Sequence, residues 1–202
     1  MDIRKAEVSR KTSETEIEIC ICLDGTGKCE ADTGIGFFDH MLNSFARHGL
    51  FDLYVRVHGD LEVDSHHTIE DTGIVLGEAI KKALGDKKGI KRFGYFILPM
   101  DETLVLASLD LSGRPYLSGR PWFGYDVALS ADRVGNFDTE MVREFFYAIS
   151  YSCGMNLHLK LMDGVNNHHI IEAAFKAFAK ALDEAVSYDA RITDVLSTKG
   201  SL

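Results

Sequence analysis

A pair of adjacent histidines, followed three residues later by a glutamate, occurs twice in this sequence. The first copy is His66-His67-Thr68-Ile69-Glu70 and the second is His168-His169-Ile170-Ile171-Glu172, so all three side chains repeat at an offset of 102 residues. Self-similarity at a fixed offset indicates an internally duplicated fold. The duplication constrains the chain strongly, because each half must build the same small unit around its own copy of the motif.

The apolar spacing around the motifs predicts the same order of elements in both halves. Alternating apolar residues predict strands, and a spacing of three or four predicts helices. In the first half, the expected strands are 3–9, 14–23 and 53–57, and the expected helices are 66–84 and 37–48, the latter ended by Gly49. In the second half, the expected strands are 93–98, 103–111 and 157–161, and the expected helices are 138–153 and 168–186. The sequence therefore predicts an α+β fold, a tandem duplication of a β-β-α-β-α unit with helices covering one face of each sheet.

The aligned halves meet near residue 90. An offset of 104 residues places the apolar positions of the first helix on those of its counterpart, for example Met41 on Phe145. We expect residues 1–90 to form the first half and residues 91–202 the second, the two together forming one domain. Residues 112–137 find no match in the first half and are expected to be an insertion.

Composition and charge exclude several classes of function. The formal net charge is −9 at pH 7, whereas a nucleic-acid-binding protein needs a basic face. None of the four cysteines forms a C-x-x-C pair, which favours a reducing compartment over a disulfide framework. No apolar run approaches the roughly 20 residues that span a bilayer. We therefore expect a cytoplasmic protein with no nucleic-acid or membrane partner.

The repeated side chains are of the kinds that bind metal ions. On a helix, a glutamate three or four residues after a histidine lies on the same face, but adjacent histidines point about 100° apart. Two ions that each take one histidine of a pair are therefore simpler than one ion that takes both. Imidazole together with carboxylate suits manganese, iron or zinc rather than a thiolate-rich structural site. His40 on the first helix aligns with Glu144, so we expect His40 to complete one metal shell and a carboxylate to stand at the equivalent place.

Four motifs, in order and over essentially the whole chain, resemble those of one enzyme family. They are Gly36-Phe37-Phe38-Asp39-His40-Met41-Leu42, residues 64–71, Ser112-Gly113-Arg114-Pro115-Tyr116 and residues 167–177. The chain resembles imidazoleglycerol-phosphate dehydratase of histidine biosynthesis. The resemblance implies a fold of the ribosomal S5 domain 2-like type, with two mixed four-stranded sheets and the helices layered between them. It also implies that the two halves form one catalytic domain. The implied enzyme is a hydro-lyase that converts D-erythro-imidazole-glycerol phosphate into imidazole-acetol phosphate through a dimetal-bound imidazolate.

The resemblance further implies two Mn²⁺ ions per active site, held by side chains from more than one subunit of a homo-oligomer, a 24-mer. The implied metal ligands are His40, His66, His67, Glu70, Glu144, His168, His169 and Glu172. Some members of the family have a histidine at the position of Glu144. Either Glu144 binds metal as a carboxylate, or one of the two sites has a weaker shell.

The remaining implied residues act on the substrate, a small phosphorylated imidazole. The implied catalytic residues, with Glu14 as a proton-transfer group, are Glu14, His67, Glu70, His169 and Glu172. The implied substrate-binding residues, several of them partners of the phosphate, are Glu14, His40, His48, Arg92, Arg114, Lys176, Ser197, Thr198 and Lys199.

Two other classes of protein stay open on the sequence. A dimetal carboxylate protein carries out oxygen or redox chemistry in helical bundles with Glu-x-x-His motifs, although here the order is reversed and strands separate the helices. A metal-storage shell would take up metal without needing Arg92, Arg114 or the basic tail. Substitution of Arg114 separates the last case, because only the lyase would lose substrate affinity while keeping its metal.

Overall fold

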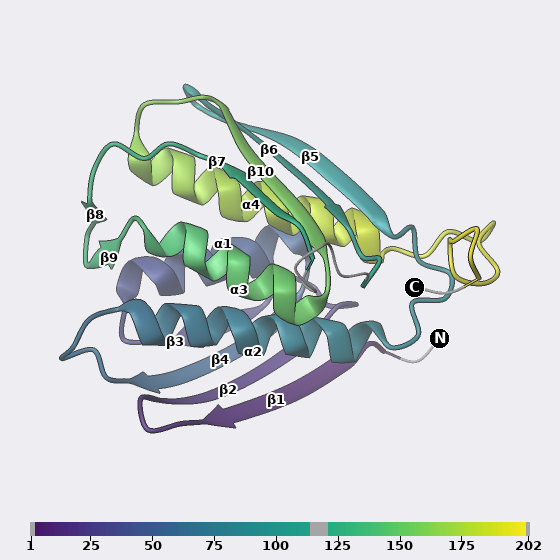
Figure 1. Ribbon diagram of the computed structural model, residues 1–202, viewed down its shortest axis with the longest axis horizontal. Coiled ribbons are helices and arrows are strands. Elements are labelled where there is room, and N and C mark those ends of the chain that lie inside the picture. The colour runs from purple at the N-terminus through teal and green to yellow at the C-terminus, as the bar shows by residue number, and fades with distance from the viewer. Residues whose placement is uncertain (1–2, 114–120, 201–202) are drawn as a thin grey trace.

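Two four-stranded sheets enclose a layer of helices in the computed structural model, which describes residues 3–113 and 121–200 (Figure 1). The first sheet, in the order β1-β2-β4-β3, consists of β1 (Lys5–Lys11), β2 (Thr15–Cys22), β3 (Cys29–Asp32) and β4 (Asp52–Gly59). The second, in the order β5-β6-β10-β7, consists of β5 (Phe93–Met100), β6 (Thr103–Asp110), β7 (Phe123–Asp126) and β10 (Asn156–Asp163). In each sheet one edge strand, β3 or β7, runs parallel to its neighbour and the other pairs are antiparallel. The predicted α+β fold with two mixed sheets is confirmed.

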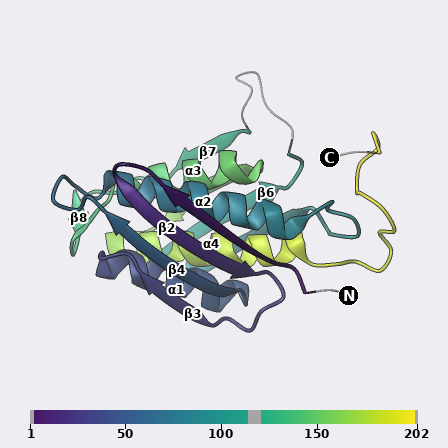
Figure 2. The same ribbon diagram turned by 90° about the horizontal axis from the view of Figure 1, so that it is seen from below.

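The helices form pairs that each join the two halves. The first helix of one half packs against the second helix of the other, so α1 (Gly36–Gly49) contacts α4 (Asn167–Val186), and α2 (His66–Leu84) contacts α3 (Met141–Cys153). A short hairpin of β8 (Arg133–Val134) and β9 (Phe137–Asp138) precedes α3. Seen from below, the first sheet lies across the helix layer (Figure 2). No helix within the described residues is both long enough and apolar enough to cross a membrane.

Each four-stranded sheet contains one more strand than the apolar pattern indicated. β3 and β7 are four residues long, lie at sheet edges and contain no fully buried residue, so they lack the alternation by which a half-buried strand is recognised. β7 lies inside 112–137 and holds the sheet position that β3 holds in the first half, so this segment is not wholly an insertion. The repeated unit is β-β-β-α-β-α.

The end of α1 differs from the expectation at Gly49. The left-handed residue that ends the helix is Leu50, with φ of 57°, and Gly49 is the last helical residue. Gly49 is needed for packing instead, because a Cβ there would lie 2.3 Å from Cε2 of the buried Phe51.

Phenylalanines from three helices occupy the centre of the helix layer. The ring of Phe175 on α4 lies 5.1 Å from that of Phe145 and 4.8 Å from that of Phe146, both on α3. Phe178 stacks on Phe45 of α1 with ring centroids 5.7 Å apart. Aromatic pairs of this kind add about 0.5–1.5 kcal/mol each beyond the burial of their area. The two halves therefore share one core, which fixes the helix ends that carry the histidines relative to one another.

Candidate active site

Three side chains of the kinds that bind metal ions, drawn from both halves, meet near the start of α4. His40 on α1 and His168 and Glu172 on α4 offer ligand atoms that all lie within 4.8 Å of one another. Oε2 of Glu172 lies 3.1 Å from Nε2 of His168 and 3.5 Å from Nε2 of His40. Residues 168 and 172 share a helix face because they are one turn apart, and the α1–α4 contact adds His40. Within residues 3–113 and 121–200, this is the one group of three or more His, Cys, Asp or Glu side chains that is so compact.

Glu172 is buried and also forms an ion pair with Lys176. Oε1 of Glu172 lies 2.7 Å from Nζ of Lys176, one turn further along α4. Burial opposes the ionisation of Glu172, but Lys176 and the nearby imidazoles outweigh it, and the pKa of the carboxyl lies below its ordinary value. Glu172 is therefore an anion whose Oε2 faces two imidazoles. The structure brings Lys176, predicted to bind substrate, to this group.

The equivalent side chains of the other half lie on α2 and α3. Nε2 of His66 lies 3.4 Å from Oε2 of Glu70, which repeats the pairing of histidine and glutamate on α4. Glu144, the counterpart of His40, lies in the first turn of α3 and accepts a hydrogen bond from Nη1 of Arg143 at 3.0 Å. It does not form a compact group with His66 and Glu70 in the part of the chain that is described. The halves are alike in their His–Glu pairs and differ at the third position.

The second histidine of each pair points away from the first. The rings of His66 and His67 have centroids 6.1 Å apart and planes 77° apart, and those of His168 and His169 are 6.1 Å and 83° apart. Neither His67 nor His169 belongs to the compact group of its own chain. This divergence is what adjacent positions on a helix impose.

A carboxylate contacts Nδ1 of each second histidine. Asp60, just after β4, lies 3.0 Å from Nδ1 of His67, and Glu102, in the β5–β6 turn, lies 2.9 Å from Nδ1 of His169. The hydrogen bond to Asp60 raises the pKa of His67, and that to Glu102 raises the pKa of His169. The same bond to His169 is the main reason that the pKa of Glu102 falls to about 2. Glu14, predicted as a proton-transfer group, lies on the other side of His67, with Oε1 3.9 Å from Nε2.

Sequence reasoning did not single out Asp60 or Glu102. The internal repeat could have pointed to Glu102. Glu102 directly precedes the buried Thr103 at the start of β6, as Glu14 directly precedes the buried Thr15 at the start of β2.

Three predicted substrate residues gather elsewhere. Arg92, Ser197 and Thr198 line one cavity of about 590 Å³. The guanidinium of Arg92 is buried and donates to both carboxylate oxygens of Asp110, at 2.7 and 3.0 Å, and to the carbonyl oxygen of Leu196 at 2.7 Å. Arg92 therefore ties the C-terminal segment to the second sheet.

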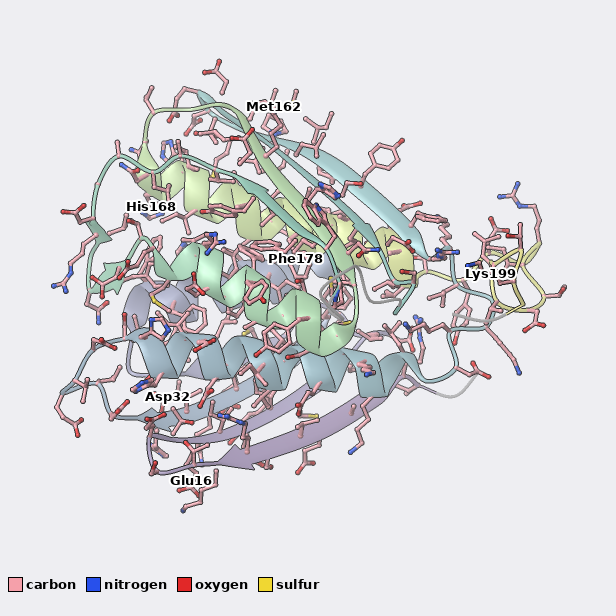
Figure 3. All side chains as sticks on the ribbon, in the orientation of Figure 1. Glu16, Asp32, Met162, His168, Phe178 and Lys199 are labelled. Carbon is pink, nitrogen blue, oxygen red and sulfur yellow. The ribbon has the colours of Figure 1, made fainter. Side chains whose placement is uncertain are left out.

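This second group is far from the histidines of its own chain. His168 and Lys199 lie at opposite ends of the molecule (Figure 3). His48 lies in the last turn of α1, two turns beyond His40, and its Nδ1 is 2.9 Å from the carbonyl oxygen of Ser44. Arg114 lies outside the described residues. The residues predicted to bind metal and those predicted to bind the phosphate are therefore widely separated within one chain.

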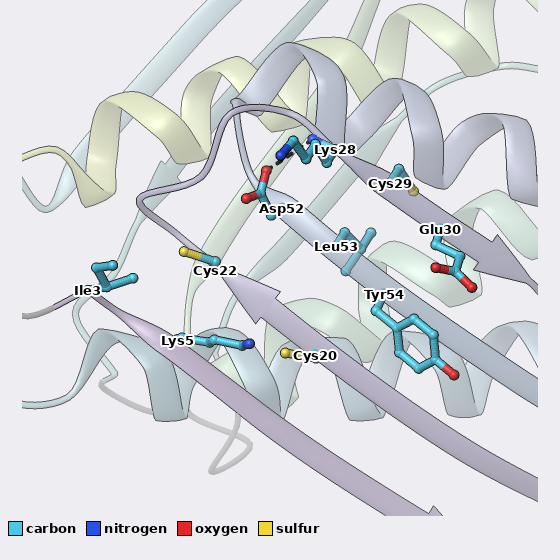
Figure 4. Close-up of a pocket in the computed structure, with 10 residues that line it drawn as sticks. All are labelled: Ile3, Lys5, Cys20, Cys22, Lys28, Cys29, Glu30, Asp52, Leu53 and Tyr54. Carbon is cyan, nitrogen blue, oxygen red and sulfur yellow. Dashed lines mark hydrogen bonds between the residues drawn. The ribbon is translucent and has the colours of Figure 1, made fainter.

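Another cavity, of about 490 Å³, lies on the outer side of the first sheet (Figure 4). Cys20, Cys22 and Cys29 contribute to its lining, and Oδ1 of Asp52 accepts a hydrogen bond from the backbone N–H of Lys28 at 3.1 Å. None of the predicted site residues lines it.

Comparison with known proteins decides among the classes of function. The sequence profile described as imidazoleglycerol-phosphate dehydratase matches residues 33–182, well over half of the chain. The chain belongs to the imidazoleglycerol-phosphate dehydratase family. The imidazoleglycerol-phosphate dehydratase of Lachnoclostridium phytofermentans is 65% identical over 199 residues, which cover 98% of each chain. That of Caldanaerobacter subterraneus is 62% identical over 200 residues, covering 99% of this chain and all of the relative.

Solved structures of imidazoleglycerol-phosphate dehydratase have the same fold. The crystal structure from Staphylococcus aureus matches with a TM-score of 0.80 and 38% identity, covering 92% of this chain and 99% of that one. The crystal structure from Pyrococcus furiosus, in complex with (S)-C348, matches with a TM-score of 0.80 and 36% identity, covering 96% of this chain and all of that one. The family predicted from the motifs, and its enzyme class, a lyase of histidine biosynthesis, are confirmed.

Proposed function

We propose that this chain catalyses the metal-dependent dehydration of imidazole-glycerol phosphate to imidazole-acetol phosphate, with two Mn²⁺ ions per active site. The observation that carries the metal dependence is the compact group of His40, His168 and Glu172, which two helices from opposite halves build together. Membership of the dehydratase family supports the reaction. We also propose a cytoplasmic location, as expected from the composition.

The donor set of this group fits a divalent cation. Ligand atoms bonded at about 2.1 Å and at right angles lie about 3.0 Å apart. The two shortest separations here, 3.1 and 3.5 Å, are close to that value. Two imidazole nitrogens and one carboxylate oxygen suit Mn²⁺ among the metals that accept mixed nitrogen and oxygen ligands. Lys176 holds the other oxygen of Glu172, which leaves Oε2 for the ion.

The distance between the two groups supports active sites shared between subunits. Val186 lies eighteen positions after His168 on α4, about 27 Å away at 1.5 Å per residue, and Ser197 and Thr198 lie beyond that end. A glycerol phosphate tail only a few bonds long cannot span this length. Arg92, Ser197 and Thr198 would therefore bind the phosphate beside the histidines of another subunit, as the expected 24-mer requires.

Glu14 is the proposed proton-transfer group. Its carboxylate is half exposed, lies in the turn before β2 and faces Nε2 of His67. A carboxylate in this position can take the proton from the substrate carbon and return one to the departing hydroxyl. Bound divalent cations supply the positive charge that favours ionisation of the imidazole ring. Lys176 keeps Glu172 ionised and in place.

Reconstitution of the metal-free protein with Mn²⁺ under anaerobic conditions, followed by an assay for imidazole-acetol phosphate, tests this function. We expect activity that depends on the metal, and we expect His168→Ala to lose both bound metal and activity. Glu18→Gln, an exposed position on the outer face of the first sheet, is the matched control and should keep both. Full turnover by metal-free protein or by His168→Ala would contradict the proposal.

A further inference from the structure

We propose that Asp60 and Glu102 are positioning residues that fix the ring orientation and tautomer of His67 and His169, and that this arrangement leaves Glu14 free for proton transfer. The inference rests on the proposed function, since it assigns the outward Nε2 atoms of both rings to a metal ion.

The contacts determine the tautomer of both rings. Both carboxylate oxygens of Asp60 lie close to Nδ1 of His67, at 3.0 and 3.2 Å, and one oxygen of Glu102 lies 2.9 Å from Nδ1 of His169. An ionised carboxylate can only accept, so Nδ1 of each neutral ring carries the hydrogen and donates it. The lone pair is then on Nε2. Metal-binding histidines commonly use the second nitrogen in this way, which holds the ring and makes it a better ligand.

Glu102 is itself held by further donors. Its Oε1 accepts a hydrogen bond from the backbone N–H of Asn166 at 3.0 Å and from Oγ1 of Thr103 at 3.1 Å. Its Oε2 is left for His169. Asn166 is the N-cap of α4, and its own side chain accepts from the backbone N–H groups of His168 and His169. The carboxylate and the helix start are thereby locked together.

The two halves use different carboxylates for the same task. Glu14 and Glu102 occupy equivalent turns, before Thr15 of β2 and before Thr103 of β6. The alignment of the halves places Gly164 opposite Asp60, so the second half has no side chain at that place. Glu102 must therefore hold His169 itself.

In the first half Asp60 holds His67. Glu14, the turn residue equivalent to Glu102, is therefore not needed to hold the ring. Glu14 lies 3.9 Å from Nε2 of His67, on the side of the ring where substrate and metal would be. In the second half, Asp101 lies 3.9 Å from Nε2 of His169 and is largely exposed, so it does not orient the ring. The duplicated turn thus has a proton-transfer residue in one half and a positioning residue in the other.

Mn²⁺ affinity of the full chain tests the two roles. The concentration of free Mn²⁺ is followed by its EPR signal during titration of wild type, Asp60→Ala, Glu102→Ala and Glu102→Gln. Loss of such a supporting carboxylate weakens metal binding about 10–100-fold. We expect losses in that range for both alanine variants. We expect a smaller loss for Glu102→Gln, because the amide oxygen still accepts from Nδ1. Glu18→Ala is the control and should bind as wild type does.

The tautomer provides a readout that needs no variant. In metal-free wild type labelled with ¹⁵N-histidine, at a pH where the rings are neutral, we expect His67 and His169 to carry the hydrogen on Nδ1. Hydrogen on Nε2 of these rings would overturn the inference, and so would wild-type Mn²⁺ affinity in both alanine variants. Wild-type protein that binds no Mn²⁺ at all would instead contradict the proposed function.

The variant Glu14→Gln tests whether the equivalent residues Glu14 and Glu102 have different roles. It should keep the Mn²⁺ affinity of wild type and lose turnover, whereas Glu102→Ala should lose affinity. Equal loss of affinity in these two variants would overturn the division of roles.

Discussion

The close approach of α2 and α3 depends on two glycines spaced one turn apart. A Cβ at Gly73 would lie 2.8 Å from the carbonyl oxygen of Phe145 and 2.9 Å from Cβ of Ala148. A Cβ at Gly77 would lie 2.8 Å from the carbonyl oxygen of Ile149. Each oxygen belongs to the backbone of α3, which cannot rotate away as a side chain can. We therefore predict that Gly73→Ala destabilises the protein, although alanine is the better helix former.

The magnitude follows from two opposing effects. Replacing glycine by alanine inside a helix gains about 1 kcal/mol of helix propensity. Overpacking a well-filled core costs about 1–3 kcal/mol, and the backbone contact at Gly73 places this variant in the upper part of that range. The free energy of unfolding should fall by about 1–2 kcal/mol. For a chain of this size that corresponds to a drop of about 2–8 °C in Tm.

Urea unfolding of the metal-free protein, at matched subunit concentration, measures the change. Gly36→Ala is the matched control, because Gly36 starts α1 and a Cβ there would meet nothing within 4 Å. Its stability should be unchanged or higher by up to about 1 kcal/mol. If Gly73→Ala gains stability as Gly36→Ala does, the contact between α2 and α3 leaves room for a Cβ at this point and the reasoning is wrong.

Three further predictions concern the core, acid stability and thiol reactivity. Phe175→Ala should lower the free energy of unfolding by about 3–5 kcal/mol, because the ring is fully buried against α3. Glu102 has a folded-state pKa of about 2 against an ordinary value of 4.5, so it adds stability above about pH 4.5 that is lost as the pH falls toward 2. The difference in urea midpoint between wild type and Glu102→Gln should therefore shrink over that range, and a constant difference would contradict it. Burial raises the pKa of Cys153 to about 12, so mass spectrometry after iodoacetamide treatment at pH 8 should find Cys153 unmodified in the folded protein.

Local periodicity accounts for the part of the fold that could be predicted. The apolar spacing of α2 gave the bounds found in the structure, His66–Leu84, because one face of that helix is buried along its whole length. β3 and β7 escaped prediction because an edge strand of four residues buries too little for a pattern to form. The left-handed residue at the end of α1 was misplaced by one position, because Gly49 is required by the ring of Phe51 and not by its own φ.

Part of the candidate site could likewise be predicted from the sequence, and part could not. The pairing of His168 with Glu172 follows from helix geometry alone. The repeat alignment predicted that His40 completes one metal shell, but it did not predict that His168 and Glu172 would be its neighbours. The contacts of Asp60 and Glu102 depend on where a loop and a hairpin turn meet a helix start, which local sequence does not determine. The ligand and substrate roles of the individual residues stay predictions.

The crossed pairing of helices bears on how such a chain arose. Because α1 contacts α4 and α2 contacts α3, neither half can assemble a three-ligand cluster from its own helices. A half-length chain would have to form a dimer to assemble such a cluster, and that symmetric dimer would contain two identical clusters. In the duplicated chain this symmetry is broken, because His40 and Glu144 are different residues at equivalent positions, and Glu14 and Glu102 make different contacts with their histidines.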